Sequence, residues 1–225
     1  MISDIEIFWG SGSPFSWRVL LMLEIKKIPY ISRRLDFSKK EHKKPEFLKI
    51  NPRGKLPALR EGNFTLSESL AIMVYLDRKF PELPFFGRKA EEEALIWKVI
   101  SDFSYFIFPA TSRVILPIFT GQLAGNEDNV KTAAVEVNAE LQRLDDGLKD
   151  QSWLAGTNNI SAADIAVYPF IAALERAAGK EIAKPLNLGF CELGRHYPNL
   201  KAWCQRICKQ PGYDKAYPPH WREAA

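Results

Sequence analysis

The chain has 225 residues, of which 46% are hydrophobic and 26% are charged, a composition typical of a folded protein of one or two domains and not of a disordered one. The longest weakly charged stretch, residues 103–124, contains an arginine and two prolines, which argues against a membrane span, and the acidic N-terminal residues do not resemble a secretory or transit signal. The net charge of +4 is densest at residues 39–44, a cluster too short for nucleic-acid binding but suited to a small anion.

The three cysteines all lie near the C-terminus, at Cys191, Cys204 and Cys208. An odd number in one short region is not a disulfide framework and fits a reducing compartment, so we expect a cytoplasmic protein. Cys204 and Cys208 are spaced to be neighbours on a helix, but no further ligand residues accompany them, and we expect no metal site.

The N-terminal segment predicts a strand, a helix and a second strand. Residues 4–9 alternate like a strand, and a Gly-Ser-Gly-Ser-Pro turn follows them. Apolar residues then recur at helical spacing from Phe15, with Ser13 placed as an N-cap and Pro14 at the first helical position. A second extended segment runs from Pro29 through Leu35, which completes a unit of the size of a parallel βαβ motif.

A hairpin and a third helical segment are expected next. Two short strands are predicted at residues 58–60 and 64–66, separated by the Glu-Gly-Asn turn signal at 61–63. Ser67 is expected to cap a helix that ends near Lys79. The Phe-Pro-Glu-Leu-Pro sequence at 80–84 reads as a stiff linker, so we place domains at residues 1–83 and 84–225.

Everything after the linker is predicted to be helical. One helix should run from Ala90 to about Ile107 and be kinked or broken past Pro109. Ser161 and Asp164 form a capping-box pattern at the start of a later helix. Two apolar stripes are expected to face the core, one at Val130, Ala134, Val137, Leu141, Leu144 and Leu148, the other at Leu200, Trp203, Cys204 and Ile207.

Four motifs in this order resemble the cytosolic glutathione transferases over nearly the whole chain. They are residues 13–19 (Ser-Pro-Phe-Ser-Trp-Arg-Val), residues 42–48 with 51–59, residues 66–72 (Leu-Ser-Glu-Ser-Leu-Ala-Ile), and residues 161–164 (Ser-Ala-Ala-Asp). The motifs combine features similar to the zeta, phi and omega classes of that family. The resemblance implies an α/β thioredoxin-like N-terminal domain followed by an all-α helical-bundle C-terminal domain.

The resemblance also implies an activity: a transferase that conjugates the thiolate of glutathione, its co-substrate, to apolar electrophiles in detoxification, and that acts as a homodimer. Two alternatives remain open, a zeta-like glutathione-dependent isomerase of the maleylacetoacetate type and a non-catalytic protein-assembly module with this fold. Nucleic acid and membrane are not expected partners. Because the N-terminal domain has no cysteine, glutaredoxin-like disulfide exchange is disfavoured.

The expected catalytic group is the hydroxyl of Ser13, which would donate a hydrogen bond to the glutathione sulfur at a helix N-terminus, where a thiolate is favoured. The alternative is that Ser13 is only a helix N-cap without a catalytic role. Ser11 and Ser16 are the fallback candidates for the catalytic serine. The remaining expected glutathione-binding residues follow from the family resemblance and are Lys55, Leu56 and Pro57 in a cis-proline loop, Glu68 and Ser69 for the γ-glutamyl end, and His42 and Lys43 for the glycine carboxylate.

Structural roles could also account for these residue types: helix capping and charge balance at residues 67–68, and a solvated basic loop at Lys43. Candidates for the electrophile pocket are Trp9, Tyr105, Phe106, Phe108 and Arg113, and for each aromatic residue core packing is the favoured alternative.

Overall fold

The computed structural model describes residues 4–222, and these form two compact units. The first contains the described residues up to Phe86 together with the segment from Lys209 onward, and the second is Gly87–Cys208. This division differs from the sequence-based one of 1–83 and 84–225 at the C-terminus, because the segment after residue 208 groups with the sheet-containing unit.

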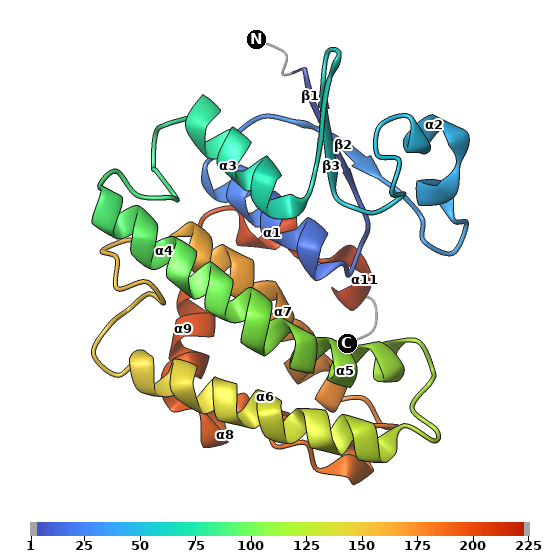
Figure 1. The fold of residues 1–225 in the computed structure, drawn as a ribbon, viewed down its shortest axis with the longest axis vertical. Helices are drawn as coiled ribbons and strands as arrows, with labels where there is room; N and C mark the ends of the chain where they lie inside the picture. The colour runs from blue at the N-terminus through green and yellow to red at the C-terminus, as the bar shows by residue number, and fades with distance from the viewer. Residues whose placement is uncertain (1–3, 223–225) are drawn as a thin grey trace. The chain divides into compact units, whose positions relative to one another are not determined.

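A four-stranded mixed sheet forms the centre of the first unit (Figure 1). Its strands are β1 (Ile5–Trp9), β2 (Ile31–Arg34), β3 (Ala58–Glu61) and β4 (Phe64–Ser67), in the order β2-β1-β3-β4. β1 and β2 are parallel, as the predicted βαβ unit requires, whereas β3 is antiparallel to both β1 and β4. Gly62, at a φ of +57°, makes the turn of the predicted hairpin.

Helices cover both faces of this sheet. α1 (Pro14–Ile25) and α3 (Ser69–Lys79) pack together on one face, and the short α2 (Pro45–Leu48), preceded by the 3₁₀ turn η1 (Glu41–Lys43), lies on the other (Figure 1). On the α2 face, buried Phe47 meets Phe8 with ring centroids 5.8 Å apart, and Ala58 completes this small core. The thioredoxin-like arrangement expected for the N-terminal domain is therefore confirmed.

The second unit consists of helices. Their bounds are α4 (Ala90–Asp102), the π-helical turn η2 (Phe103–Ile107), α5 (Phe108–Phe119), α6 (Glu127–Gly147), α7 (Ala162–Ala178), the 3₁₀ turn η3 (Lys184–Leu186), α8 (Leu193–His196) and α9 (Pro198–Cys208). The apolar stripe of α9 is buried, as predicted, and so is that of α6 except for half-exposed Leu144. The short helices α10 (Tyr213–Ala216) and α11 (Pro219–Arg222) belong to the first unit.

Two local predictions need correction. Ser67 is the last residue of β4 and pairs with Ala58, so it cannot cap α3; the N-cap is Glu68, at a φ of +69°. The irregularity near Pro109 lies before that proline and not after it, because the π turn at 103–107 bonds the Phe108 N–H to the Phe103 carbonyl. A wider turn accommodates a proline, which has no N–H for the helical ladder, at the start of α5.

One helical stretch of the described residues, Ala90–Phe119, is long and apolar enough to cross a membrane by length and composition alone. It comprises α4, η2 and α5, and the sequence-based expectation of no span considered only its interrupted C-terminal part. Its buried residues, among them Ile96, Ile100 and Val114, face the core of the second unit, where α4 and α5 pack on α7 and α5 also packs on α6. These contacts place the stretch in the helical bundle of the second unit.

Candidate functional site

The predicted binding segments of the first unit converge on one edge of the sheet. Phe8, near the end of β1, pairs with Ala58, and Ala58 pairs with Ser67 at the end of β4. Consequently the loop after β1, the loop before β3 and the start of α3 all leave the sheet at the same edge. Because β2 runs parallel to β1, with Trp9 opposite Arg34, the basic loop after β2 begins there too. Segments far apart in sequence thus surround one location.

Ser13 is the N-cap of α1, as the sequence predicts. Its backbone is extended (φ −77°, ψ 116°), Pro14 occupies the first helical turn, and the Ser13 hydroxyl oxygen accepts a hydrogen bond from the Ser16 N–H at 3.3 Å. A hydroxyl that accepts through its oxygen still has its own hydrogen to donate. Ser13 is half-buried, so this donor lies at the surface of the loop, beside the N–H groups of the helix start.

The two fallback serines have different surroundings. Ser16 is 1% exposed, and its hydroxyl accepts from the Gly10 N–H at 3.3 Å, so it belongs to the interior of the loop. Ser11 is half-buried, and its Oγ lies 2.6 Å from Nδ1 of His220 on α11. Ser16 therefore supports the turn, while Ser11 remains at the site surface with a histidine partner.

Glu68 and Ser69 stand at the start of α3. Glu68 is exposed and adopts its positive φ of +69° as the N-cap residue without any side-chain capping bond. Ser69 is 5% exposed, and its hydroxyl accepts from Arg18 of α1 at 3.4 Å. Burial lowers the pKa of the Arg18 guanidinium to about 9. Arg18, which the sequence analysis did not single out, thus connects α1 to the start of α3 and places a buried cation behind Ser69.

The loop before β3 contains the expected cis peptide bond, between Leu56 and Pro57. Asn51, which is buried, donates from its amide to the Lys55 carbonyl at 2.8 Å and fixes the loop. The Lys43 ammonium donates to the Gly54 carbonyl at 2.7 Å, so Lys43 also braces this loop. The Lys55 side chain is exposed.

His42 lies beside this loop in η1. Its ring packs edge-on against Phe37 with centroids 5.2 Å apart, and its Nδ1 is buried without a hydrogen-bond partner among the described residues. Burial, and then the charges of Lys43 and Lys55, lower the pKa of the His42 imidazole. The lowered pKa favours a neutral ring near neutral pH. An anion bound beside the ring would shift the equilibrium back toward the charged imidazolium.

A cavity of about 450 Å³ opens at this edge of the sheet. Its lining combines Ser11 of the first loop and His220 of α11 with the segment after β2, namely Arg34, Leu35, Asp36, Phe37, Lys39 and Glu41. Sequence reasoning missed His220. The only signal was the recurrence of Tyr213, Tyr217 and Trp221 at four-residue intervals, which marks an aromatic face on the C-terminal segment.

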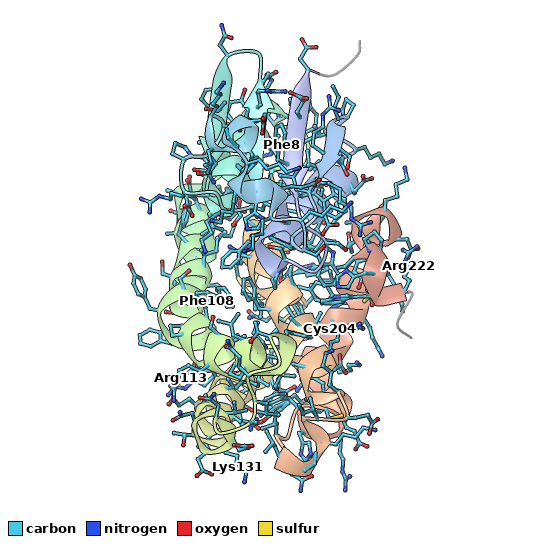
Figure 2. All side chains as sticks on the ribbon, turned by 90° about the vertical axis from the view of Figure 1, so that its right-hand side faces the viewer. Phe8, Phe108, Arg113, Lys131, Cys204 and Arg222 are labelled. Atoms are coloured by element: carbon cyan, nitrogen blue, oxygen red, sulfur yellow. The ribbon has the colours of Figure 1, made fainter. Side chains whose placement is uncertain are left out.

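The electrophile-pocket candidates come from both units. Trp9 is buried in β1 and donates to the Ser32 hydroxyl at 2.8 Å. In the second unit, Phe108 packs on Phe170, with ring centroids 5.4 Å apart, and Arg113 forms an exposed ion pair with Glu136 (Figure 2). Tyr105 and Phe106 are strongly exposed, at 76% and 61%. Within residues 4–222, no cluster of three or more His, Cys, Asp or Glu side chains is arranged to hold a metal ion.

Comparison with known proteins agrees with this geometry. Residues 12–79 match the family model of the glutathione S-transferase N-terminal domain, and residues 103–211 match that of the C-terminal domain. Glutathione S-transferase A of Pleuronectes platessa is 29% identical over 235 residues, covering 100% of this chain and 96% of the relative. Human glutathione S-transferase theta-2B is 32% identical over 210 residues, covering 90% of this chain and 80% of the relative.

A solved structure gives the same result. The crystal structure of a glutathione S-transferase from the Antarctic clam Laternula elliptica superimposes with a TM-score of 0.78 at 31% identity, covering 98% of this chain and 95% of that one. Both domain models, the full-length relatives and the sheet-plus-bundle architecture therefore coincide. The chain belongs to the glutathione S-transferase family.

Proposed function

We propose that this protein is a glutathione transferase that binds glutathione at the sheet edge described above and transfers its thiolate to apolar electrophiles. The observation that carries the proposal is the convergence of three segments: the serine-capped start of α1, the Leu56–Pro57 loop and the Glu68–Ser69 start of α3. Together they offer a hydroxyl donor, an exposed backbone edge and a carboxylate-binding helix start to one extended tripeptide.

Ser13 is the proposed thiol-activating residue. A free cysteine thiol has a pKa of about 8.5 and is mostly protonated near neutral pH, so the site must favour the anion. A hydrogen bond donated by the Ser13 hydroxyl, with the N–H groups and dipole of α1, lowers the pKa of a sulfur bound there. The available hydrogen of Ser13 and the burial of Ser16 favour Ser13 over Ser16.

The rest of glutathione would be held by the flanking segments. The backbone of Leu56 would pair with the cysteinyl part, Ser69 and the start of α3 would receive the γ-glutamyl carboxylate, and Glu68 would receive the ammonium. His42 and Lys55 would face the glycine carboxylate. Because Lys43 already donates to the Gly54 carbonyl, its role in this arrangement is chiefly to shape the loop.

Two alternatives use the same fold. A zeta-like isomerase would require the same glutathione site and differ only in its second substrate, whereas a non-catalytic assembly module would need no glutathione site. An enzyme is favoured because three glutathione-site segments are present together: the Ser13 helix start, the Leu56–Pro57 cis bond and the Glu68–Ser69 helix start. A homodimer in the cytoplasm is the proposed state, and the exposed aromatic residues Tyr105 and Phe106 are compatible with a surface used in assembly or substrate contact.

The experiment is a two-step assay of the purified chain. Binding to immobilised glutathione is measured first, and conjugation of glutathione to a panel of apolar electrophiles, together with isomerisation of maleylacetoacetate, second. The proposal expects elution by free glutathione and turnover of at least one electrophile. Binding with isomerisation alone would select the isomerase, and failure to bind glutathione would select the assembly module.

A further inference from the structure

His220 is placed directly over the start of α1 by the C-terminal segment. Its Nδ1 lies 2.6 Å from the Ser11 Oγ, and its ring edge lies over Gly12, since a Cβ added to Gly12 would come within 2.5 Å of the His220 Cε1. Both contacts lie within the first unit. The imidazole therefore adjoins the loop whose serines are the candidate thiol ligands.

An aromatic cluster holds the histidine there. Trp221, which is 5% exposed, meets Trp17 of α1 edge-on with centroids 5.3 Å apart, and Tyr217 meets the same ring at 5.5 Å. Aromatic pairs at such separations each stabilise packing beyond the area they bury. This packing fixes α11 against α1 and sets the position of His220, its neighbour in sequence.

The cavity wall beside His220 carries charges of both signs. From the cavity wall, Arg34 and Lys39 are opposed by Asp36 and Glu41, and Lys39 approaches Asp36 at 3.9 Å. On its own segment, Arg222 donates to the Asp214 carbonyl and pairs with the Asp214 carboxylate at 3.7 Å. A thiolate formed nearby would favour the charged form of the imidazole.

We propose that His220 accepts, through Ser11, the proton that the bound glutathione thiol loses, which extends the proposed transferase function. The thiol S–H bond breaks and its proton passes to the Ser11 Oγ, while the Ser11 hydroxyl proton passes to Nδ1 of His220. The products are a thiolate, an unchanged Ser11 hydroxyl and an imidazolium. This requires the neutral ring to carry its proton on Nε2, leaving Nδ1 as the acceptor across the 2.6 Å contact.

The roles of the two serines then differ. Ser13 stabilises the sulfur anion by donating a hydrogen bond, whereas Ser11 connects the sulfur to a proton acceptor. His220 acts through Ser11 and is in this sense a positioning and proton-holding residue. A merely structural histidine would affect stability but would not change the number of protons released when glutathione binds.

The test counts those protons. Calorimetric titration of the full-length protein with glutathione is carried out near pH 7.5, between the ordinary pKa of histidine, about 6.5, and that of a thiol, about 8.5, in buffers of different ionisation enthalpy. The thiolate formed is measured in parallel by its ultraviolet absorbance. S-methylglutathione, which has no thiol, corrects for protonation changes elsewhere, such as at His42.

After that correction, the wild-type protein should release markedly fewer protons than the number of thiolates formed, because His220 retains them. His220→Gln and Ser11→Ala should release one proton per thiolate, and His196→Gln, which removes an exposed histidine of the second unit, should behave like wild type. Release of one proton per thiolate by the wild-type protein would overturn the inference while leaving the transferase proposal intact. Absence of any thiolate on glutathione binding would instead overturn both.

Discussion

Replacement of Asp164 by alanine should strongly destabilise the second unit, because its carboxylate is the acceptor of a fully buried network. One oxygen accepts from the Leu154 N–H at 2.9 Å and from the Trp203 indole N–H at 2.8 Å. The other accepts from the N–H and the hydroxyl of Ser161, both at 2.9 Å. Asp164 is 0% exposed, so these donors have no direct access to solvent.

The magnitude follows from the donors that would be orphaned. The two backbone N–H groups and the indole N–H are fixed, and each buried donor left without a partner costs about 1–3 kcal/mol. Water entering the space left by the carboxylate would recover part of this, so we expect Asp164→Ala to lower the free energy of unfolding by about 3–5 kcal/mol. Ser161→Ala removes one donor to the carboxylate and leaves the other three in place, so it should cost about 1 kcal/mol.

Equilibrium denaturation followed by far-ultraviolet circular dichroism measures both changes. Glutathione binding by the folded fraction should match wild type, because Asp164 lies in the second unit and the proposed glutathione residues lie in the first. A loss below about 1 kcal/mol for Asp164→Ala, or equal losses for Asp164→Ala and Ser161→Ala, would refute the reasoning that the buried carboxylate holds this network.

Three further outcomes are expected. The hydrogen bond from Arg60 lowers the pKa of the Glu6 carboxyl, so ionised Glu6 stabilises the fold above its ordinary pKa of 4.5. The stability advantage of wild type over Glu6→Gln should therefore shrink as the pH falls below that value. Denaturation at several pH values measures this change. Phe47→Ala should cost about 3–5 kcal/mol by chemical denaturation, and a loss below about 1 kcal/mol would contradict the core assignment of Phe47 on the α2 face of the sheet. Glu68→Gln and Ser69→Ala should each weaken glutathione binding by about 1.5–3 kcal/mol in calorimetry, whereas unchanged affinity in both would reduce the pair to helix-start residues.

The locally determined features of the fold could be predicted from sequence. Ser13 followed by Pro14 specifies a helix start through side-chain capping and a fixed φ, and both effects operate within a few residues. The Ser161–Asp164 pair likewise predicts its helix, because the carboxylate reaches the Ser161 N–H three residues away. In both cases the determining interaction lies within one helical turn, where sequence patterns are informative.

The features that could not be predicted from the sequence depend on contacts between residues far apart in the chain. Ser67 matches a capping pattern, but its pairing with Ala58 extends β4 and moves the helix start to Ser69. The docking of α11 depends on Trp221 meeting Trp17, a contact across most of the chain. For that reason His220 could not be assigned to the site from its local sequence.

The central claim, that Ser13 activates the glutathione thiol, is tested most directly by the pKa of that thiol in the enzyme–glutathione complex. Thiolate absorbance is titrated against pH for the wild type, Ser13→Ala and Ser11→Ala, with Ser16→Ala as the buried-serine control. Loss of a hydrogen bond to the charged sulfur worth about 1.5–3 kcal/mol should raise the thiol pKa in Ser13→Ala by about one to two units. An unchanged pKa in Ser13→Ala, with the rise appearing in Ser11→Ala instead, would contradict the assignment.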